Sequence, residues 1–249
     1  MEDPESNSTK LWIEAENLIT SEYLDTVPDV ERLRVKLIEN QYFNKISLPE
    51  KQGQNFCFFH NADMYMFNEK NWYKFNEEDP LQGTTLFMNS SSTPAKGETY
   101  DWESSAFTSD GKYVAYMATK AGSDWKTIRV KNIETMQDLQ HDIIKQVKFS
   151  LIFWDNENNG FYYSRYDENL DDGTKTTKVG ANRVYYHKLN TKQADDIMIY
   201  ENPNEPDGSF STYITLDNKY LIITTKKSTE ETALKHYIEL DKLKDRDLS

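Results

Sequence analysis

Hydrophobic and polar positions between residues 106 and 130 alternate in three short runs separated by two polar turns. The first turn contains Asp110-Gly111, a pair that tolerates the positive φ angles of a two-residue hairpin turn. The second is Gly122-Ser123-Asp124, and alternation resumes from Trp125 to Val130. This stretch predicts a small meander of three antiparallel strands.

The same period-two pattern begins at Gln52 and continues through the rest of the chain. Residues 89–103, rich in Ser, Thr and Pro, predict a surface connection, and residues 167–181 predict an exposed loop. Further strands are predicted at residues 56–59, 64–67, 72–75, 84–88, 136–139, 147–154, 160–166, 183–189 and 235–240, and on both sides of residues 217–218.

A turn motif repeats along the chain. Asp110-Gly111-Lys112-Tyr113 recurs as Asp217-Asn218-Lys219-Tyr220, 107 residues later, and the turn at 158–161 falls roughly midway. A period of about 50 residues with about four strands per unit is typical of a β-propeller blade. Chance similarity between hairpins is the alternative, but three turns in register favour a mainly β, partial propeller of about four blades. The polar end KLKDRDLS contains no obvious closing strand, so we expect the propeller to be incomplete.

Residues 1–51 differ from the rest and predict a helical segment that precedes a β-rich domain at 52–249. Five apolar side chains share one face at helical spacing: Leu11, Trp12, Ala15, Leu18 and Ile19. Thr26-x-x-Asp29 has the form of a capping box, which predicts a second helix with a stripe at Val30, Leu33 and Leu37. Trp12 is interpreted as a core or interface anchor rather than a ligand-binding residue.

The amino-acid composition argues against two classes of binding partner, nucleic acids and membranes. A formal charge of −13 opposes binding to nucleic acid phosphates and to anionic membranes. The single cysteine, Cys57, excludes an intrachain disulfide and suits a reducing compartment. The N-terminus does not resemble a signal peptide, and no apolar run approaches the ~20 residues of a membrane helix. These features predict a cytoplasmic protein with neither nucleic acid nor membrane as a partner.

Catalytic, cofactor-binding and metal-binding motifs are not found in the sequence. The closest glycines, Gly173 and Gly180, are seven residues apart, which excludes a G-x-S-x-G nucleophile elbow and a phosphate-binding loop. The four histidines lie more than 40 residues from one another, so no H-E-x-x-H pair exists. His187 is interpreted as a structural histidine in a strand, and Cys57 as a small buried apolar residue. We therefore predict no catalytic, cofactor or metal residue in this chain.

Several stretches, in order, resemble one family. MEDPES and the helix TKLWIEAENLIT resemble the LEDP segment and following helix of prolyl oligopeptidases, which are cytosolic serine peptidases that cut peptides after proline. AFTSDGKYVAYMATKAGSDWKTIRV resembles their propeller, in which the GSDW tetrapeptide is distinctive. KFSLIFWDNENNGFYYSRY, DGTKTT and RVYYHKLNTKQADDI continue the resemblance in the same order.

The resemblance implies a seven-bladed propeller that sits as a lid over an α/β-hydrolase domain and admits oligopeptides by size. Residues 1–51 would belong to the hydrolase layer, and 52–249 would form the first half of the propeller. The family's catalytic serine, aspartate and histidine lie in a C-terminal portion that this sequence does not contain. The segment that normally precedes LEDP is also absent here.

The resemblance also suggests residues at the junction between the two domains. The tetrapeptide at 122–125 would lie on the hydrolase-facing side, with Asp124 and Trp125 as candidate interdomain contacts. The alternative role for Asp124 is a turn residue that caps the strand of Trp125. Phe43, just before the first blade, is a weaker candidate for lining the junction.

Three interpretations follow. The leading one is a truncated prolyl oligopeptidase that supplies lid and helices but no chemistry, and whose partners are the missing hydrolase domain and an oligopeptide substrate. The second is a stand-alone propeller-like module that binds a peptide or protein through its open strand edges. The third is an incomplete gene model.

Overall fold

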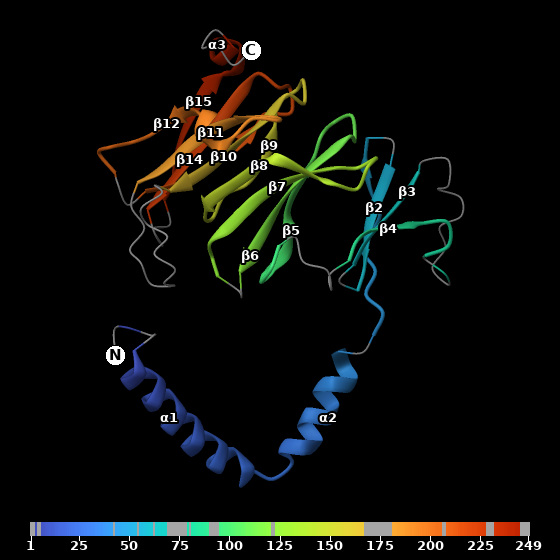
Figure 1. Ribbon diagram of the computed structural model, residues 1–249, viewed down its shortest axis with the longest axis vertical. Coiled ribbons are helices and arrows are strands. Elements are labelled where there is room, and N and C mark those ends of the chain that lie inside the picture. The colour runs from blue at the N-terminus through green and yellow to red at the C-terminus, as the bar shows by residue number, and fades with distance from the viewer. Residues whose placement is uncertain are drawn as a thin grey trace. The chain divides into compact units, whose positions relative to one another are not determined.

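The computed structural model describes residues 3, 6–41, 43–53, 55–61, 63–68, 79, 81–89, 95–120, 123–166, 181–205, 208–227 and 232–244. The chain folds into two compact units, Met1–Lys45 and Ile46–Ser249. The first is helical, and the second consists of antiparallel sheets (Figure 1).

The first unit contains α1 (Asn7–Asp25) and α2 (Val30–Gln41), and both helices were predicted. The predicted capping box is wrong. The Thr26 hydroxyl donates to a carbonyl in the last turn of α1 at 2.6 Å, so Thr26 ends the first helix instead of starting the second. Asp29 has a φ of 69°, and its carbonyl accepts the N–H of Leu33. A left-handed residue turns the chain there, and α2 starts one residue later.

Apolar side chains of both helices are exposed. Thr9 is the buried residue of α1, and α2 buries none of its residues. The exposed apolar side chains include Leu11, Trp12, Leu18, Ile19, Leu33 and Leu37. An apolar stripe of this length is typical of an interface.

The second unit is a series of antiparallel sheets, which we name blades 1 to 4 in chain order. Within each blade, every strand pairs with the strand that follows it in the sequence. Blade 1 contains β1 (Glu50–Gln52), β2 (Asn55–His60), β3 (Asp63–Asn68) and β4 (Thr85–Met88). Blade 2 contains β5 (Glu98–Phe107), β6 (Tyr113–Lys120), β7 (Lys126–Asn132) and β8 (Asp138–Val147).

Blade 3 contains β9 (Phe153–Trp154), β10 (Gly160–Tyr166), β11 (Asn182–Lys188) and β12 (Ile197–Tyr200), with a short 3-10 helix, η3 (Gln193–Asp195), before β12. Blade 4 contains β13 (Gly208–Ile214), β14 (Tyr220–Lys227) and β15 (Leu234–Glu239), followed by α3 (Leu240–Lys244). Sheets built in chain order are meanders, as in propeller blades. The prediction of a mainly β, partial propeller is confirmed.

The prediction of a surface connection at 89–103 is partly wrong, because β5 starts at Glu98. The register of β5 against β6 shifts between Asp101 and Ala106, and this irregularity breaks the alternation that would have revealed the strand.

Several other strands depart from the prediction, among them β1, which was not predicted. β8 extends to Val147, and residues 148–152 form an irregular connection, so only β9 remains of the predicted strand 147–154. β12 was not predicted. The predicted strand at 72–75 lies outside the described residues.

The core lies between blades. Along β6, Val114 and Tyr116 join the cluster shared with blade 1, whereas Ala115 and Met117 join the cluster shared with blade 3. Successive side chains of a strand point to opposite faces, so one strand supplies both clusters. β10 also supplies two clusters: Tyr162 packs in the cluster shared with blade 4, and the residues on either side of it pack in the cluster shared with blade 2. Blades 2 and 3 are therefore apolar on both faces.

The turn between the first two strands repeats in blades 2, 3 and 4. In blade 2 the hydroxyl of Thr108 accepts backbone N–H groups of the turn, Thr215 does so in blade 4, and the carboxylate of Asp155 does so in blade 3. The left-handed residues of the three turns are Gly111, Asn158 and Asn218, with φ of 69°, 58° and 57°. The repeat inferred from the sequence is thus a repeat of backbone geometry.

Neighbouring blades also touch through these turns. A Cβ atom at Gly53, in the β1–β2 turn, would lie 2.6 Å from the Cα atom of Gly111. The backbone N–H of Ser109 donates to the side-chain oxygen of Asn158 at 2.9 Å. These contacts join blade 1 to blade 2 and blade 2 to blade 3 at the same end.

The close packing of blade 3 makes a prediction about Gly160. A Cβ atom there would lie 2.2 Å from the carbonyl oxygen of His187 and 2.6 Å from the ring of Tyr186. We expect Gly160→Ala to lower the free energy of unfolding by about 2–3 kcal/mol, because the backbone of β11 cannot yield easily. Urea unfolding monitored by circular dichroism measures the change.

Gly208→Ala is the matched control. A Cβ atom at Gly208 would meet the Glu205 carbonyl at 3.2 Å and a Thr225 methyl group at 3.4 Å, so we expect a loss below about 1 kcal/mol. Equal losses for the two variants would contradict the packing described here.

Candidate functional site

The three residues predicted at a domain junction fall in different parts of the structure. Asp124 and Trp125 lie in the connection between β6 and β7, in the second unit. Phe43 belongs to the first unit, where it is 60% exposed and the Lys45 ammonium lies 5.1 Å from its ring centre. Gly122, the first residue of the tetrapeptide, lies outside the described residues.

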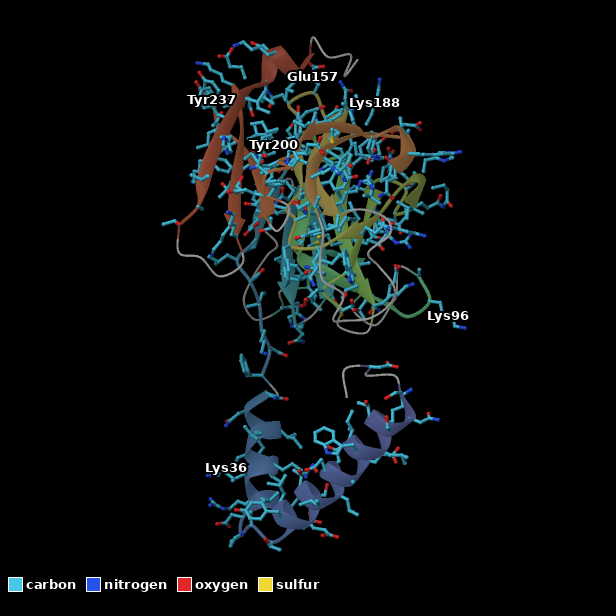
Figure 2. All side chains as sticks on the ribbon, turned by 90° about the vertical axis from the view of Figure 1, so that its left-hand side faces the viewer. Lys36, Lys96, Glu157, Lys188, Tyr200 and Tyr237 are labelled. Atoms are coloured by element: carbon cyan, nitrogen blue, oxygen red, sulfur yellow. The ribbon has the colours of Figure 1, made fainter. Side chains whose placement is uncertain are left out.

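The turn at Asp124 is at the end of the blades opposite to the repeated turns. Glu98 of β5 pairs with Lys120, next to this turn, whereas Phe107 at the other end of β5 leads into the Asp110-Gly111 turn. Figure 2 shows the same polarity, with Lys96 and Glu157 at opposite ends of the second unit. We call the end that carries Asp124 the Asp124 end.

Ser123, rather than Asp124, holds the turn closed. The Ser123 hydroxyl accepts the N–H of Trp125 at 3.2 Å, and the Thr119 hydroxyl donates to the carbonyl of Ser123. The Asp124 side chain is 61% exposed and lies 3.3 Å from the ammonium group of Lys148. Its carboxylate is therefore directed to a neighbouring segment and not to its own turn.

Lys148 is the centre of a small cluster at this end. Its side chain is only 11% exposed, and its ammonium group lies 5.5 Å from the ring centre of Trp125 and 5.0 Å from that of Phe149. Tyr166, at the end of β10, packs edge-on against Trp125 at 5.8 Å. We call Asp124, Trp125, Lys148, Phe149 and Tyr166 the Lys148 cluster. Aromatic rings and one carboxylate stabilise the largely buried cation.

Phe149 is a member of this cluster that sequence reasoning missed. It is 63% exposed and has a φ of 55°, and Gln146 three residues earlier has a φ of 59°. Two left-handed non-glycine residues so close together are uncommon and mark a functional or strained segment. Ser150 ties the segment down, because its hydroxyl accepts the N–H of Ser164 at 2.8 Å. The run VKFSLIFW contains no signal for this break in the strand.

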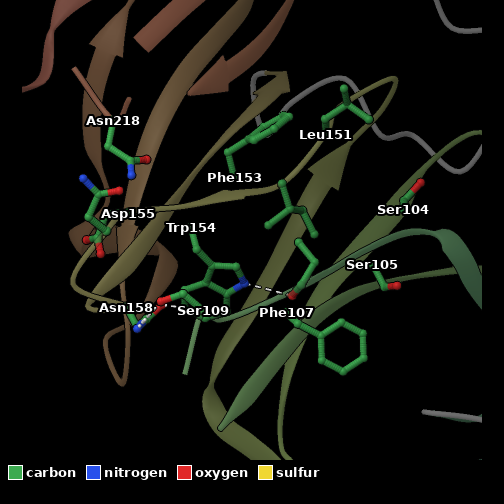
Figure 3. Close-up of a pocket in the computed structure, with 13 residues that line it drawn as sticks. Ser104, Ser105, Phe107, Ser109, Leu151, Phe153, Trp154, Asp155, Asn158 and Asn218 are labelled. Carbon is green, nitrogen blue, oxygen red and sulfur yellow. Dashed lines mark hydrogen bonds between the residues drawn. The ribbon is translucent and has the colours of Figure 1, made fainter. Parts of the chain in front are cut away.

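A second feature is a pocket of about 550 Å³ near the repeated turns (Figure 3). The indole N–H of Trp154 donates to the carbonyl of Ala106 at 2.8 Å, and Ser109 and Asn158 close one side. Its lining is mainly hydroxyl, amide and apolar: Ser104, Ser105, Ala106, Phe107, Ser109, Leu151, Ile152, Phe153, Trp154, Asp155, Asn156, Asn158 and Asn218. The carboxylate of Asp155 accepts hydrogen bonds from N–H groups of its own turn and from the Tyr186 hydroxyl. The pocket therefore provides a surface for binding and, among the described residues that line it, no carboxylate that is free to act as an acid or base.

The two side chains best suited to catalysis, those of Cys57 and His187, are buried. Cys57 is 6% exposed, and burial, together with the charge of Glu50, raises the pKa of its thiol to about 12, which disfavours the nucleophilic thiolate. His187 is fully buried between Asp142 and Asp196, as expected of a structural histidine.

Among the residues that the structure describes, no group of three or more His, Cys, Asp or Glu side chains is arranged to hold a metal ion. In the same residues, no helix is long and apolar enough to span a membrane.

Residues 1–247 match the family model for the prolyl oligopeptidase N-terminal β-propeller domain. The chain belongs to the prolyl oligopeptidase family. It is 30% identical over 234 residues to the prolyl endopeptidase of Elizabethkingia meningoseptica, and the alignment covers 94% of this chain and 32% of that protein. It is 29% identical over 254 residues to prolyl oligopeptidase A of Amanita bisporigera, which covers 92% and 33%.

Solved structures of the prolyl oligopeptidase family share the fold. Prolyl oligopeptidase B from Galerina marginata, bound to a 35mer hydrolysis and macrocyclization substrate, matches with a TM-score of 0.81 at 23% identity, over 95% of this chain and 34% of that chain. The chain spans about a third of the length of the curated relatives that it matches. The resemblance identified from the sequence is confirmed, and the matched part is the N-terminal propeller domain.

The two partners of the Asp124–Lys148 ion pair are predicted to contribute unequally to stability. Asp124→Asn leaves a largely buried ammonium without its carboxylate, and we expect it to lower the free energy of unfolding by about 1–2 kcal/mol. Lys148→Met keeps the apolar stem and leaves an exposed, hydrated carboxylate, so we expect a loss below about 1 kcal/mol.

Urea unfolding of both variants and of the unchanged chain tests this order. If Lys148→Met is the more damaging change, the contacts of Lys148 with the rings of Trp125 and Phe149 outweigh its pair with Asp124, and the order predicted here is wrong.

Proposed function

We propose that this chain is the propeller lid of a prolyl oligopeptidase-like serine endopeptidase, which cleaves short peptides after proline. The observation that carries the proposal is the family match over residues 1–247, together with blades that follow one another in chain order. In this proposal the propeller restricts substrates by size, admitting oligopeptides to a hydrolase domain.

The chain supplies no peptidase chemistry in this proposal. Among the described residues, Cys57 is unsuited to act as a nucleophile because its thiol is buried. His187 is unsuited to act as a general base because both of its ring nitrogens are hydrogen-bonded to carboxylates. In this proposal the catalytic serine, aspartate and histidine lie in a C-terminal portion, as the family resemblance implies. Acyl transfer through an activated serine and an oxyanion hole would take place there.

The Asp124 end is the surface proposed to face the hydrolase domain. Asp124 is 61% exposed, and Phe149 beside it is 63% exposed in a left-handed conformation. An exposed carboxylate anchored by a buried lysine presents a fixed polar contact, and an exposed aromatic ring adds apolar area. The ring of Trp125 lies 5.5 Å from the Lys148 ammonium group that pairs with Asp124, and Phe43 is proposed to line the same junction.

The helical segment, predicted as residues 1–51, is proposed to belong to the hydrolase layer, and the rest, predicted as residues 52–249, to the lid; since β1 pairs with β2, the boundary is proposed at Ile46, where the second unit begins. The exposed apolar side chains of α1 and α2 support this assignment, because they provide a face that a second domain could cover. The partners in the proposal are the hydrolase domain and an oligopeptide, in the cytoplasm, without nucleic acid or membrane.

The test compares this chain alone with a chimera. In the chimera, this chain replaces the matched third of the Elizabethkingia meningoseptica prolyl endopeptidase, and the substrate is a short proline-containing fluorogenic peptide. We expect no hydrolysis by the chain alone. We expect the chimera to hydrolyse the short peptide and to leave a folded protein substrate intact.

Two outcomes would contradict the proposal. Reproducible hydrolysis by the chain alone, abolished by a serine-reactive inhibitor, would show that the chain is more than a lid. A chimera that folds and digests folded protein as fast as the short peptide would show that this propeller does not restrict substrates by size.

A stand-alone binding module is the second candidate, and the edge of blade 4 favours it. On β15, Leu234 is 60% exposed and Tyr237 is 67% exposed, and Figure 2 shows Tyr237 at the outer side of the sheet. An exposed strand edge can recruit an extended peptide. Light scattering of the purified chain separates the candidates: a discrete, monodisperse species supports the module, and aggregation supports a lid that needs its hydrolase domain.

A further inference from the structure

His187 sits between two carboxylates at the contact of blades 2 and 3. The imidazole, at the end of β11, is fully buried. Its Nδ1 lies 2.6 Å from Oδ1 of Asp196, and its Nε2 lies 3.2 Å from Oδ1 of Asp142. Asp142 belongs to β8 of blade 2, and Asp196 follows η3 in blade 3. One imidazole therefore bridges two blades.

Other groups hold both carboxylates in place. The Tyr163 hydroxyl donates to Oδ2 of Asp196 at 2.5 Å, and the N–H of Asn190 donates to Oδ1 of Asp142 at 2.8 Å. The second oxygen of Asp142 is buried and has no hydrogen-bond partner among the residues that the structure describes. Asp142 thus depends strongly on the imidazole for its stabilisation in the interior.

The connection between β11 and β12 also pairs with the outer strand of blade 2. The side-chain amide of Gln193 accepts the N–H of Lys145 at 3.0 Å and donates to the carbonyl of Lys145 at 3.2 Å. This amide takes the place of a neighbouring strand at the edge of β8. Asp142 and Lys145 are therefore both held by blade 3, immediately before the left-handed residue Gln146.

The geometry favours a charged imidazole between two carboxylates. A neutral imidazole carries one N–H and can donate to only one of the two carboxylates, whereas the imidazolium donates to both. Burial opposes the charge, but the hydrogen bonds to Asp142 and Asp196 and their negative charges outweigh it and raise the pKa of His187 from 6.5 to about 9.

We propose that Asp142, His187 and Asp196 form a proton-dependent clasp between blades 2 and 3, closed while His187 is charged, and that the clasp fixes the segment 146–149 that carries Lys148 and Phe149. Loss of the proton removes the imidazole N–H from Asp142 or from Asp196, and that buried carboxylate is then left with only its other donor, the N–H of Asn190 or the hydroxyl of Tyr163. The edge of β8 is then attached to blade 3 only through the hydrogen bonds of Gln193 and Asn190, and the support of the segment that follows is weakened.

The charged and titratable groups around the imidazole come from three elements. Asp142 faces it from β8, and Asp196 faces it from the connection before β12. On β10, Tyr163 faces Asp196, and the positive charge of Arg165 acts on Tyr163. Phe161, also on β10, packs its ring 5.1 Å from the imidazole and excludes water from it.

The clasp makes stability depend on pH in a defined direction. The pKa of His187 is higher in the folded chain than in the unfolded chain, so the folded state binds the proton more tightly. The contribution is complete below pH 6.5, declines between pH 6.5 and about 9, and is lost above it. Within that window, one proton changes the folding equilibrium constant by up to about tenfold per pH unit.

The experiment measures urea unfolding of the 249-residue chain between pH 6 and 10, for the unchanged chain, His187→Gln and His141→Gln. His141 is exposed and adjacent to Asp142, which makes it the matched control. We expect His187→Gln to remove the decline between pH 6.5 and 9, and His141→Gln to retain it. A decline that persists in His187→Gln would overturn the proposal.

Two further measurements keep the test decisive. In the unchanged chain, proton NMR should show that His187 titrates near pH 9; titration of His187 near 6.5 would overturn the clasp even if His187→Gln fails to fold. At pH 7, the amides of Lys145 and Asn190 should exchange at least about tenfold faster in His187→Gln than in His141→Gln, since both depend on the clasp. Equal exchange would refute the link to β8.

Discussion

The structure depends on one constraint: a strand that is apolar on both sides must be covered on both sides. β6 and β10 each send alternate side chains to opposite faces, and both sets are buried. A blade of this kind cannot fold in isolation without exposing one apolar face. Blades 2 and 3 therefore pack face against face with their neighbours, and the hydrophobic core consists of the layers between blades.

Polar contacts then set how adjacent blades align. At one end, Gly53 packs against Gly111, and Ser109 bonds to Asn158, so the repeated turns hold successive blades together. Elsewhere, the buried His187 and Lys148 place charge in the interior. Lys148 pairs with Asp124, and His187 pairs with Asp142, which is 45 residues away in the sequence. Such buried charge pairs form in only one arrangement, whereas apolar contacts alone allow several.

Period-two alternation and the Asp-Gly type of turn were sufficient to predict the repeating blades and most strands. β5 and β8 were misjudged because a register shift and solvent-facing polar positions interrupt the alternation. The position of Asp124 in a turn was predictable, but its partner was not. Lys148 lies in a run that reads as continuous strand, and a left-handed Phe149 cannot be inferred from residue type. The partnership of Asp142 with His187 spans 45 residues and depends on how two blades dock.

Native-state hydrogen exchange, resolved along the chain, tests the central claim that stability comes from the layers between blades. The account predicts the slowest exchange in β6, β7, β10 and β11, whose blades are covered on both faces, and faster exchange in β2 and β15 of the terminal blades. Uniform protection across all four blades, or greatest protection in a terminal blade, would contradict it.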